Sequence, residues 1–248
     1  NCSLTISGTE DQPATFTQNY ALSSGGALKW TQNQPQISSS NVHFTHNQAS
    51  YGYNVAATTS KILPIASNTA LTAGSTNPQI VPFPTQTTAP TNTTTPLSLK
   101  SGSPLPTDLY FAIVDIYGQV ITNENTSEAA IFTAQKHQKN ITILDSNRLS
   151  TNGIFNFKST KLITTPGKHI QLAIKLTNSD NPPPPTTLSI FISHCEIGEI
   201  LTDQNACFRC GDEVGDENAT ARVRRKYTLT AGGDECLECP ENALCWGG

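Results

Sequence analysis

The chain has 248 residues, of which 14% are charged, and its formal net charge is −4 at pH 7. It has no basic arm and no apolar run approaching ~20 residues, so we expect no nucleic-acid partner and no membrane span. Thr, Ser, Asn, Gln, Pro and Gly dominate the composition, which favours strands and turns over helices. We therefore expect an all-β protein. Because it begins at Asn1 and contains no Met, we expect a processed chain or a piece of a longer one.

Residues 1–60 contain a repeat. FTQNYA, which begins at Phe16, returns as FTHNQA at Phe44, 28 positions later. This period predicts stacked coils of a β-solenoid (a parallel β-helix), with Phe16 and Phe44 stacked inside. Asn19 and Asn47 are expected at turns, in left-handed backbone, and bonded along the stack. The alternative is two sandwich hairpins that share a motif. A solenoid needs roughly three or more coils, so we expect further coils from a preceding segment or another molecule.

Residues 61–96 are assigned to a linker. Pro82–Pro96 is rich in Thr and Pro and almost free of apolar side chains, so it lacks the surface to order itself by burial. A flexible linker without sugar is one possibility. We favour an O-glycosylated linker, with candidate sites at Thr85, Thr87, Thr88, Thr91, Thr93, Thr94 and Thr95.

Residues 97–195 read as short strands separated by Asn, Gly, Pro and Lys. About seven strands over ~100 residues is typical of an Ig-like β-sandwich. The longest strand, HIQLAIKL, is expected to bury one face made of Ile170, Leu172, Ile174 and Leu176. The proline run in Asn181–Thr187 predicts a projecting loop that serves as a spacer, a glycosylated spike or a contact site.

Residues 196–248 are expected to form a small module held by cross-links, since they contain few apolar residues. Two CxxC pairs resemble a four-thiolate zinc site. We favour disulfides, because an even set of six cysteines lies close together: Cys195, Cys207, Cys210, Cys236, Cys239 and Cys245. Connectivity cannot be read from the sequence. Nearest-neighbour pairing would join Cys195 to Cys207 and Cys239 to Cys245, leaving Cys210 with Cys236. Cys2 is the odd cysteine.

N-glycosylation sequons are spread over the whole chain and favour a secreted, oxidising context. They begin at Asn1, Asn92, Asn125, Asn140 and Asn218.

Several motifs in a fixed order resemble large surface proteins of ciliated and related protists. The carboxyl-terminal CxxC…CxxCPxxAxCxGG pattern is similar to their Cys-rich, growth-factor-receptor-like junction. The resemblance also includes DIYG at Asp115–Gly118, PG at Pro166–Gly167, GGALKW at Gly25–Trp30 and NQASYGYNVA at Asn47–Ala56. It implies the end of a parallel β-helix, an Ig-like module and a Cys-rich junction in an extracellular, non-catalytic protein. The long Thr/Pro linker and the proline loop depart from the family pattern.

We expect no enzyme and no cofactor other than covalent glycans. A β-helix lyase or hydrolase needs clustered carboxylates, and residues 1–60 offer only Glu10 and Asp11, which would point to opposite faces of a strand. His43 and His46 are an unconvincing metal pair. The leading hypothesis is a structural subunit of an extracellular or cell-surface assembly (a filament, hair or coat) whose partners are copies of itself. The alternatives are an adhesin or receptor ectodomain that binds extracellular carbohydrate or protein, and the non-catalytic tail of a β-helix carbohydrate-active enzyme.

Overall fold

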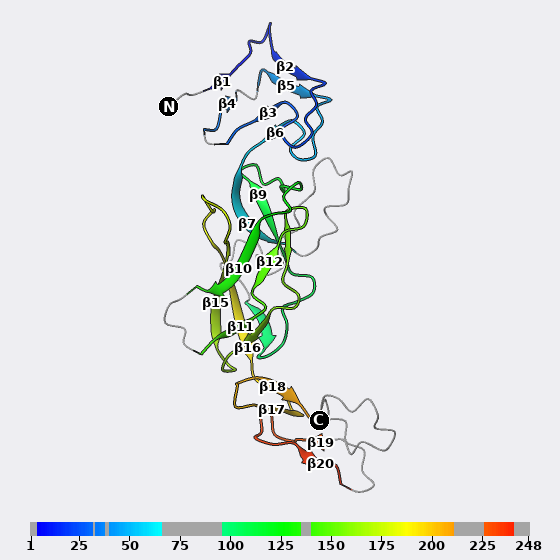
Figure 1. Ribbon diagram of the computed structural model, residues 1–248, viewed down its shortest axis with the longest axis vertical. Coiled ribbons are helices and arrows are strands. Elements are labelled where there is room, and N and C mark those ends of the chain that lie inside the picture. The colour runs from blue at the N-terminus through cyan, green and yellow to red at the C-terminus, as the bar shows by residue number, and fades with distance from the viewer. Residues whose placement is uncertain are drawn as a thin grey trace.

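The computed structural model describes residues 4–31, 33–37, 40–65, 96–134, 140–210 and 226–240. These residues form strands, turns and loops without a helix among them, which confirms the all-β class. The described residues accordingly contain no helix of the length and apolarity that crossing a membrane requires. Three parts follow one another along the long axis of the molecule (Figure 1): a stack of two coils, a pair of sheets around one core, and a small disulfide-rich part.

The coil stack, residues 4–57, consists of two turns of chain. The strands of the first turn are β1 (Thr5–Ile6), β2 (Ala14–Thr17) and β3 (Leu28–Lys29), and those of the second are β4 (Gln36–Ile37), β5 (Val42–Thr45) and β6 (Val55–Ala56). β1 pairs with β4, β2 with β5 and β3 with β6, in each case in parallel. Adjacent strands of a hairpin are antiparallel, so two hairpins do not describe this part of the chain.

Glycines form the corner before the last strand of each turn. Gly25 and Gly52 have φ angles of 68° and 60°. A Cβ at Gly25 would lie 2.4 Å from the Leu28 carbonyl oxygen, and one at Gly52 would lie 2.6 Å from that of Val55. Any other residue would therefore clash and be strained at these corners.

The middle part holds the main core. Its strands are β7 (Thr59–Ile65), β8 (Leu97–Lys100), β9 (Tyr110–Asp115), β10 (Glu128–Thr133), β11 (Thr142–Leu144), β12 (Asn147–Leu149), β13 (Ile154–Asn156), β14 (Lys161–Ile163), β15 (His169–Leu176) and β16 (Thr186–Ser193). A five-stranded sheet has the order β12-β10-β15-β16-β8, a three-stranded sheet has the order β13-β9-β7, and β11 pairs with β14. Both larger sheets contribute to one apolar cluster, which includes Phe111 from β9 and Leu172 from β15. β15 buries the alternate residues that its sequence predicts.

The structure corrects the start of the linker. Residues 61–65 belong to β7, which pairs antiparallel with β9 and buries Ile62 and Ile65. β7 is the edge strand of its sheet, where Pro64 is tolerated because an edge residue needs no second ladder partner. The Thr/Pro-rich remainder of the linker, residues 66–95, lies outside the described residues.

The proline loop connects the two longest strands. β15 and β16 pair antiparallel, and Asn178 in the connection accepts a hydrogen bond from the Glu128 N–H and donates one to the Thr126 carbonyl. Pro183 is buried while the prolines on both sides of it are exposed. The loop is therefore fixed to the neighbouring strand connection and not wholly projecting.

The disulfide-rich part contains two small antiparallel sheets. β17 (Glu199–Leu201) pairs with β18 (Cys207–Arg209), and β19 (Lys226–Tyr227) pairs with β20 (Leu237–Glu238). Of its larger apolar side chains, Ile197, Leu229 and Leu237 are exposed and the others are half-buried. Burial of apolar surface therefore stabilises this part little, and cross-links are needed to hold it.

Candidate functional site: the open end of the coil stack and its joint

Ladders of like side chains join the two turns of the coil stack. The rings of Phe16 and Phe44 stack with centroids 5.2 Å apart and planes 18° apart. The hydroxyl oxygens of Thr17 and Thr45 lie 2.9 Å apart and share a hydrogen bond. The structure therefore brings together the two Phe residues that the repeat singled out, in the parallel register between β2 and β5.

Asn47 is the polar centre of the stack and is only 6% exposed. Its Oδ1 accepts from the backbone N–H of Asn19 at 3.0 Å and from Asn19 Nδ2 at 2.9 Å. Its Nδ2 donates to the Phe16 carbonyl at 2.9 Å and to Asn54 Oδ1 at 3.1 Å. Asn19 occupies the equivalent position in the first turn, yet it is exposed. Among the described residues no donor contacts its Oδ1.

The expected left-handed backbone falls one residue earlier than predicted. Gln18 and His46, not Asn19 and Asn47, both have φ of 56°. This turn lets the following Asn direct its side chain along the stack, where it satisfies backbone groups of the neighbouring turn. The prediction treated Asn as the turn residue itself, and its role as a ladder residue outweighs that preference.

The first turn presents an unpaired strand edge. The N–H groups of Ala14 and Gln18 donate to carbonyls of the second turn at 2.9 and 3.1 Å. In a parallel ladder successive residues point their N–H and C=O groups to opposite sides, so those of Thr15 and Thr17 point away from β5. Within the described residues β2 has β5 as its sole partner. This edge can accept another strand.

Burial also decreases toward the first turn. Val42 of the second turn is buried beneath Ala14, which is half-exposed. The first turn carries the most exposed large apolar side chains of the stack, Leu4, Tyr20 and Leu22, at 58%, 69% and 81%. The stack is therefore covered on the side of the core and open on the side of β1, β2 and β3.

A buried tyrosine and aspartate join the coil stack to the sheets. The Tyr51 hydroxyl donates to Asp115 Oδ2 at 2.5 Å and accepts from the Ala57 N–H at 3.3 Å. Asp115 is fully buried, and its Oδ1 accepts from the N–H groups of Tyr117 and Gln119. Burial and then the hydrogen bond to Asp115 raise the pKa of Tyr51 far above its ordinary value.

Other contacts extend this joint over both turns. The Trp30 ring meets the Tyr117 ring edge-on with centroids 5.2 Å apart, so the first turn also contacts the segment after β9. Three more side chains on the side of the sheets donate hydrogen bonds to the coil stack: Gln119 Nε2 to Val55 O, Thr122 Oγ1 to Ser50 O, and Asn123 Nδ2 to Ser23 Oγ. The coil stack is thus fixed to the sheets at several points. The underside of β6, which is the side that faces away from β3, is occupied by Gln119.

No sequence pattern described above predicted this joint. Asp115 was noted only as part of a turn motif, yet it ends a strand of otherwise apolar or aromatic residues, Tyr110–Val114. A carboxylate at the end of a buried strand needs hydrogen-bond partners, and that signal could have marked Asp115.

Disulfides link the cysteines of the carboxyl-terminal part. Cys195 is bonded to Cys207 and Cys210 to Cys236, which are two of the nearest-neighbour pairs named above. Cys239 is also disulfide-bonded. The sulfurs of Cys195 and Cys207 lie close to a Glu199 carboxylate oxygen, but they are bonded to each other and are not free thiolates. Disulfides of this kind are typical of an oxidising, non-cytosolic compartment.

A lysine between two glutamates connects the sheets to the disulfide-rich part. Lys100 Nζ lies 2.8 Å from Glu196 Oε2 and 2.7 Å from Glu199 Oε1. Burial raises the pKa of Glu199, but hydrogen bonds from the Glu196 N–H and from Lys100 outweigh it, so the pKa lies below its usual range. The Cys207 N–H donates to the Ser101 carbonyl at 3.0 Å beside this pair.

Two predicted glycosylation sites are described and both are exposed. Asn125 accepts from the Asn152 N–H through its Oδ1 at 2.7 Å, which leaves its Nδ2 available for a sugar. Asn140 has a φ of 69°. The other predicted positions lie outside the described residues: Cys2, Cys245, Asn1, Asn92, Asn218, Thr85, Thr87, Thr88, Thr91, Thr93, Thr94 and Thr95.

The two acidic residues of the coil region do not lie on a strand. Glu10 and Asp11 are exposed in the bend between β1 and β2, so the expectation that they point to opposite faces of a strand is wrong. His43 lies on β5 and His46 follows it, and both are exposed.

No protein-family model matches the chain, and the search of curated proteins finds no match either.

Proposed function

We propose that the protein is a structural subunit of an extracellular, glycosylated assembly such as a filament, hair or surface coat, and that it self-associates through the open end of its coil stack. The observation that carries this proposal is the unpaired outer edge of β2, with the Phe, Thr and Asn ladders ending beside it. The disulfides, the exposed sequons and the resemblance to protist surface proteins support the extracellular setting.

The occupied underside of β6 limits how two copies meet. Gln119 donates to the Val55 carbonyl there at 3.0 Å, so head-to-tail stacking of coils would break the joint. Head-to-head pairing requires no such loss. In that arrangement β2 of one copy lies antiparallel to β2 of a second copy about a two-fold axis. The smallest assembled unit is then a dimer, and a larger assembly adds a second contact elsewhere.

One register suits the side chains at this edge. Antiparallel pairing of Thr15 with Thr17 of the second copy uses the outward N–H and C=O groups of both. It places the two Phe16 side chains opposite each other on the inner face. The aromatic stack of Phe44 and Phe16 then continues into the second molecule, and surface that is half-exposed in one copy becomes buried.

Substitutions at Thr15 test the edge without disturbing the ladder to β5. Thr15→Pro removes an N–H that points outward, whereas Thr15→Val keeps it in a residue that favours strands. We expect sedimentation of the native, unreduced protein to show dimers or larger species for the wild type and Thr15→Val, and monomers for Thr15→Pro. Electron microscopy of the same samples would reveal filaments or other regular assemblies.

Two results contradict the proposal. Dispersed monomers of the wild type at every concentration would exclude self-association as the function. Assembly of Thr15→Pro at the wild-type concentration would exclude the β2 edge as the contact.

A further inference from the structure

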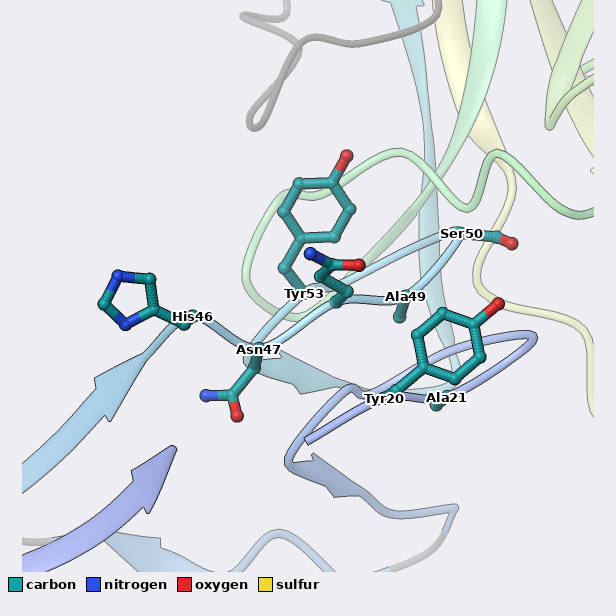
Figure 2. A pocket seen from close by; sticks show the side chains of 8 residues that line it. Tyr20, Ala21, His46, Asn47, Ala49, Ser50 and Tyr53 are labelled. Carbon is teal, nitrogen blue, oxygen red and sulfur yellow. The ribbon is translucent and has the colours of Figure 1, made fainter. Parts of the chain in front are cut away.

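A groove lies on the coil stack, in the segments that follow β2 and β5. It has a volume of about 490 Å³ and is lined by residues from both turns, including Tyr20 of the first turn and Tyr53 of the second. Figure 2 shows the Tyr53 ring above the chain at Ala49 and the Tyr20 ring below it, with His46 toward one end and Ser50 toward the other. The volume lies in the range of small-molecule sites, about 300–1,000 Å³.

The floor of the groove is made of small side chains. Ala21 and Ala49 occupy equivalent places in the two turns and both line it. Beneath the Tyr20 ring, the parallel bridge to Gln48 is closed by backbone hydrogen bonds of 2.9 Å on each side. The backbone between the two turns is already paired there, so an extended peptide finds no free strand edge between them.

Aromatic, amide and other polar side chains make up the rest of the groove lining. Tyr20 is 69% exposed, which leaves most of a flat apolar ring uncovered. Gln48 adds an amide to the lining, and the Ser50 hydroxyl, which donates to the Leu22 carbonyl at 2.8 Å, can still accept a hydrogen bond. The lining contains no Asp, Glu, Lys or Arg. Apart from His46 at one end, the lining offers a phosphate, sulfate or carboxylate ligand no side chain that can carry the opposite charge.

We infer that this groove binds a neutral saccharide. A sugar ring has an apolar C–H face that packs on a tyrosine ring and hydroxyls that pair with amide and hydroxyl groups, which is the combination the groove presents. The shallow, two-turn groove suits a short oligosaccharide lying across the coils. The lining does not include Thr15, Phe16 or Thr17, the residues used in the proposed self-association.

The test uses the full chain and a panel of neutral tetrasaccharides built from glucose, mannose or N-acetylglucosamine. A sulfated tetrasaccharide serves as the acidic probe, and binding is measured by calorimetry and by saturation-transfer NMR. We expect saturable binding of at least one neutral tetrasaccharide. Tyr20→Ala should weaken it about tenfold or more, the loss of one stacked ring.

Two variants serve as controls. Tyr20→Phe keeps the ring and should bind within about threefold of the wild type. Leu22→Ala removes an exposed apolar side chain of the same turn that does not line the groove, and it should not change the affinity. Because Tyr20 is exposed, its substitution leaves the fold intact, which circular dichroism checks.

Three results overturn the inference: no neutral tetrasaccharide binds, the sulfated probe binds more tightly than every neutral one, or Tyr20→Ala binds as tightly as Leu22→Ala.

Discussion

Replacing Tyr51 by Phe removes a single oxygen from the joint between the coil stack and the sheets. The Tyr51 hydroxyl donates to the fully buried Asp115 and accepts from the Ala57 N–H. A hydrogen bond to a charged group contributes about 1.5–3 kcal/mol and an ordinary one about 1 kcal/mol. We therefore expect the free energy of unfolding to fall by about 2–4 kcal/mol.

Urea unfolding measures this loss with two probes. Trp30 contacts Tyr117 at the joint, so with the second tryptophan, Trp246, replaced by Phe in every variant, tryptophan fluorescence follows the joint. Circular dichroism follows all strands. In the wild type both transitions should coincide. In Tyr51→Phe the urea midpoint measured by fluorescence should be lower than the midpoint measured by circular dichroism, because the coil stack separates from the sheets first.

Tyr53→Phe is the matched control. Tyr53 lies two residues after Tyr51 in the second turn and lines the open groove. Loss of its hydroxyl should therefore change the free energy of unfolding by less than about 0.5 kcal/mol. If Tyr51→Phe costs no more than this control, the buried pair does not hold the joint and the reasoning is wrong.

Three further predictions concern the ladders, the cross-links and pH. Asn47→Ala should cost about 2–3 kcal/mol in urea unfolding because it breaks a buried network of four hydrogen bonds, whereas Asn19→Ala, which removes one of them, should cost under about 1 kcal/mol. Removing the Cys210–Cys236 bond, whose partners are 26 residues apart, should lower stability by about 3.5 kcal/mol in the chain-entropy estimate, measured by thermal unfolding of the double Ser variant. Because the pKa of Tyr51 is raised in the folded state, deprotonation favours the unfolded chain, so stability should fall as pH rises above about 10 and fall less steeply in Tyr51→Phe.

The repeat was sufficient to predict how the first part of the chain pairs. Phe16 and Phe44 stand at the same position of two similar segments, and side chains of one kind meet when the segments lie parallel and in register. The pattern of β15 was equally informative, because alternate apolar residues on a strand require one buried face. Both features are periodic and local in sequence, which is why they could be predicted.

The joint could not be predicted in the same way. Tyr51 and Asp115 are 64 residues apart, and no period connects them. The boundary at residue 61 failed for a related reason: Lys61–Ile65 lies outside the repeat and contains a proline, and its pairing with β9, about 50 residues away along the chain, is what makes it part of a strand. The parallel pair of β8 and β16 likewise depends on the return path of the chain through the fold.

The two joints bear on what the proposed assembly would look like. The first joint, at Tyr51 and Asp115, connects both coil turns to the segment after β9. The second joint, at Lys100 with Glu196 and Glu199, connects the same sheets to the disulfide-rich part. In each joint hydrogen bonds connect residues distant in sequence, so the three parts keep a defined arrangement and do not swing on single-chain linkers. Two copies joined at their β2 edges would then form one elongated particle with a disulfide-rich part at each end. For this dimer to grow into a filament, a second contact elsewhere on the molecule would be needed.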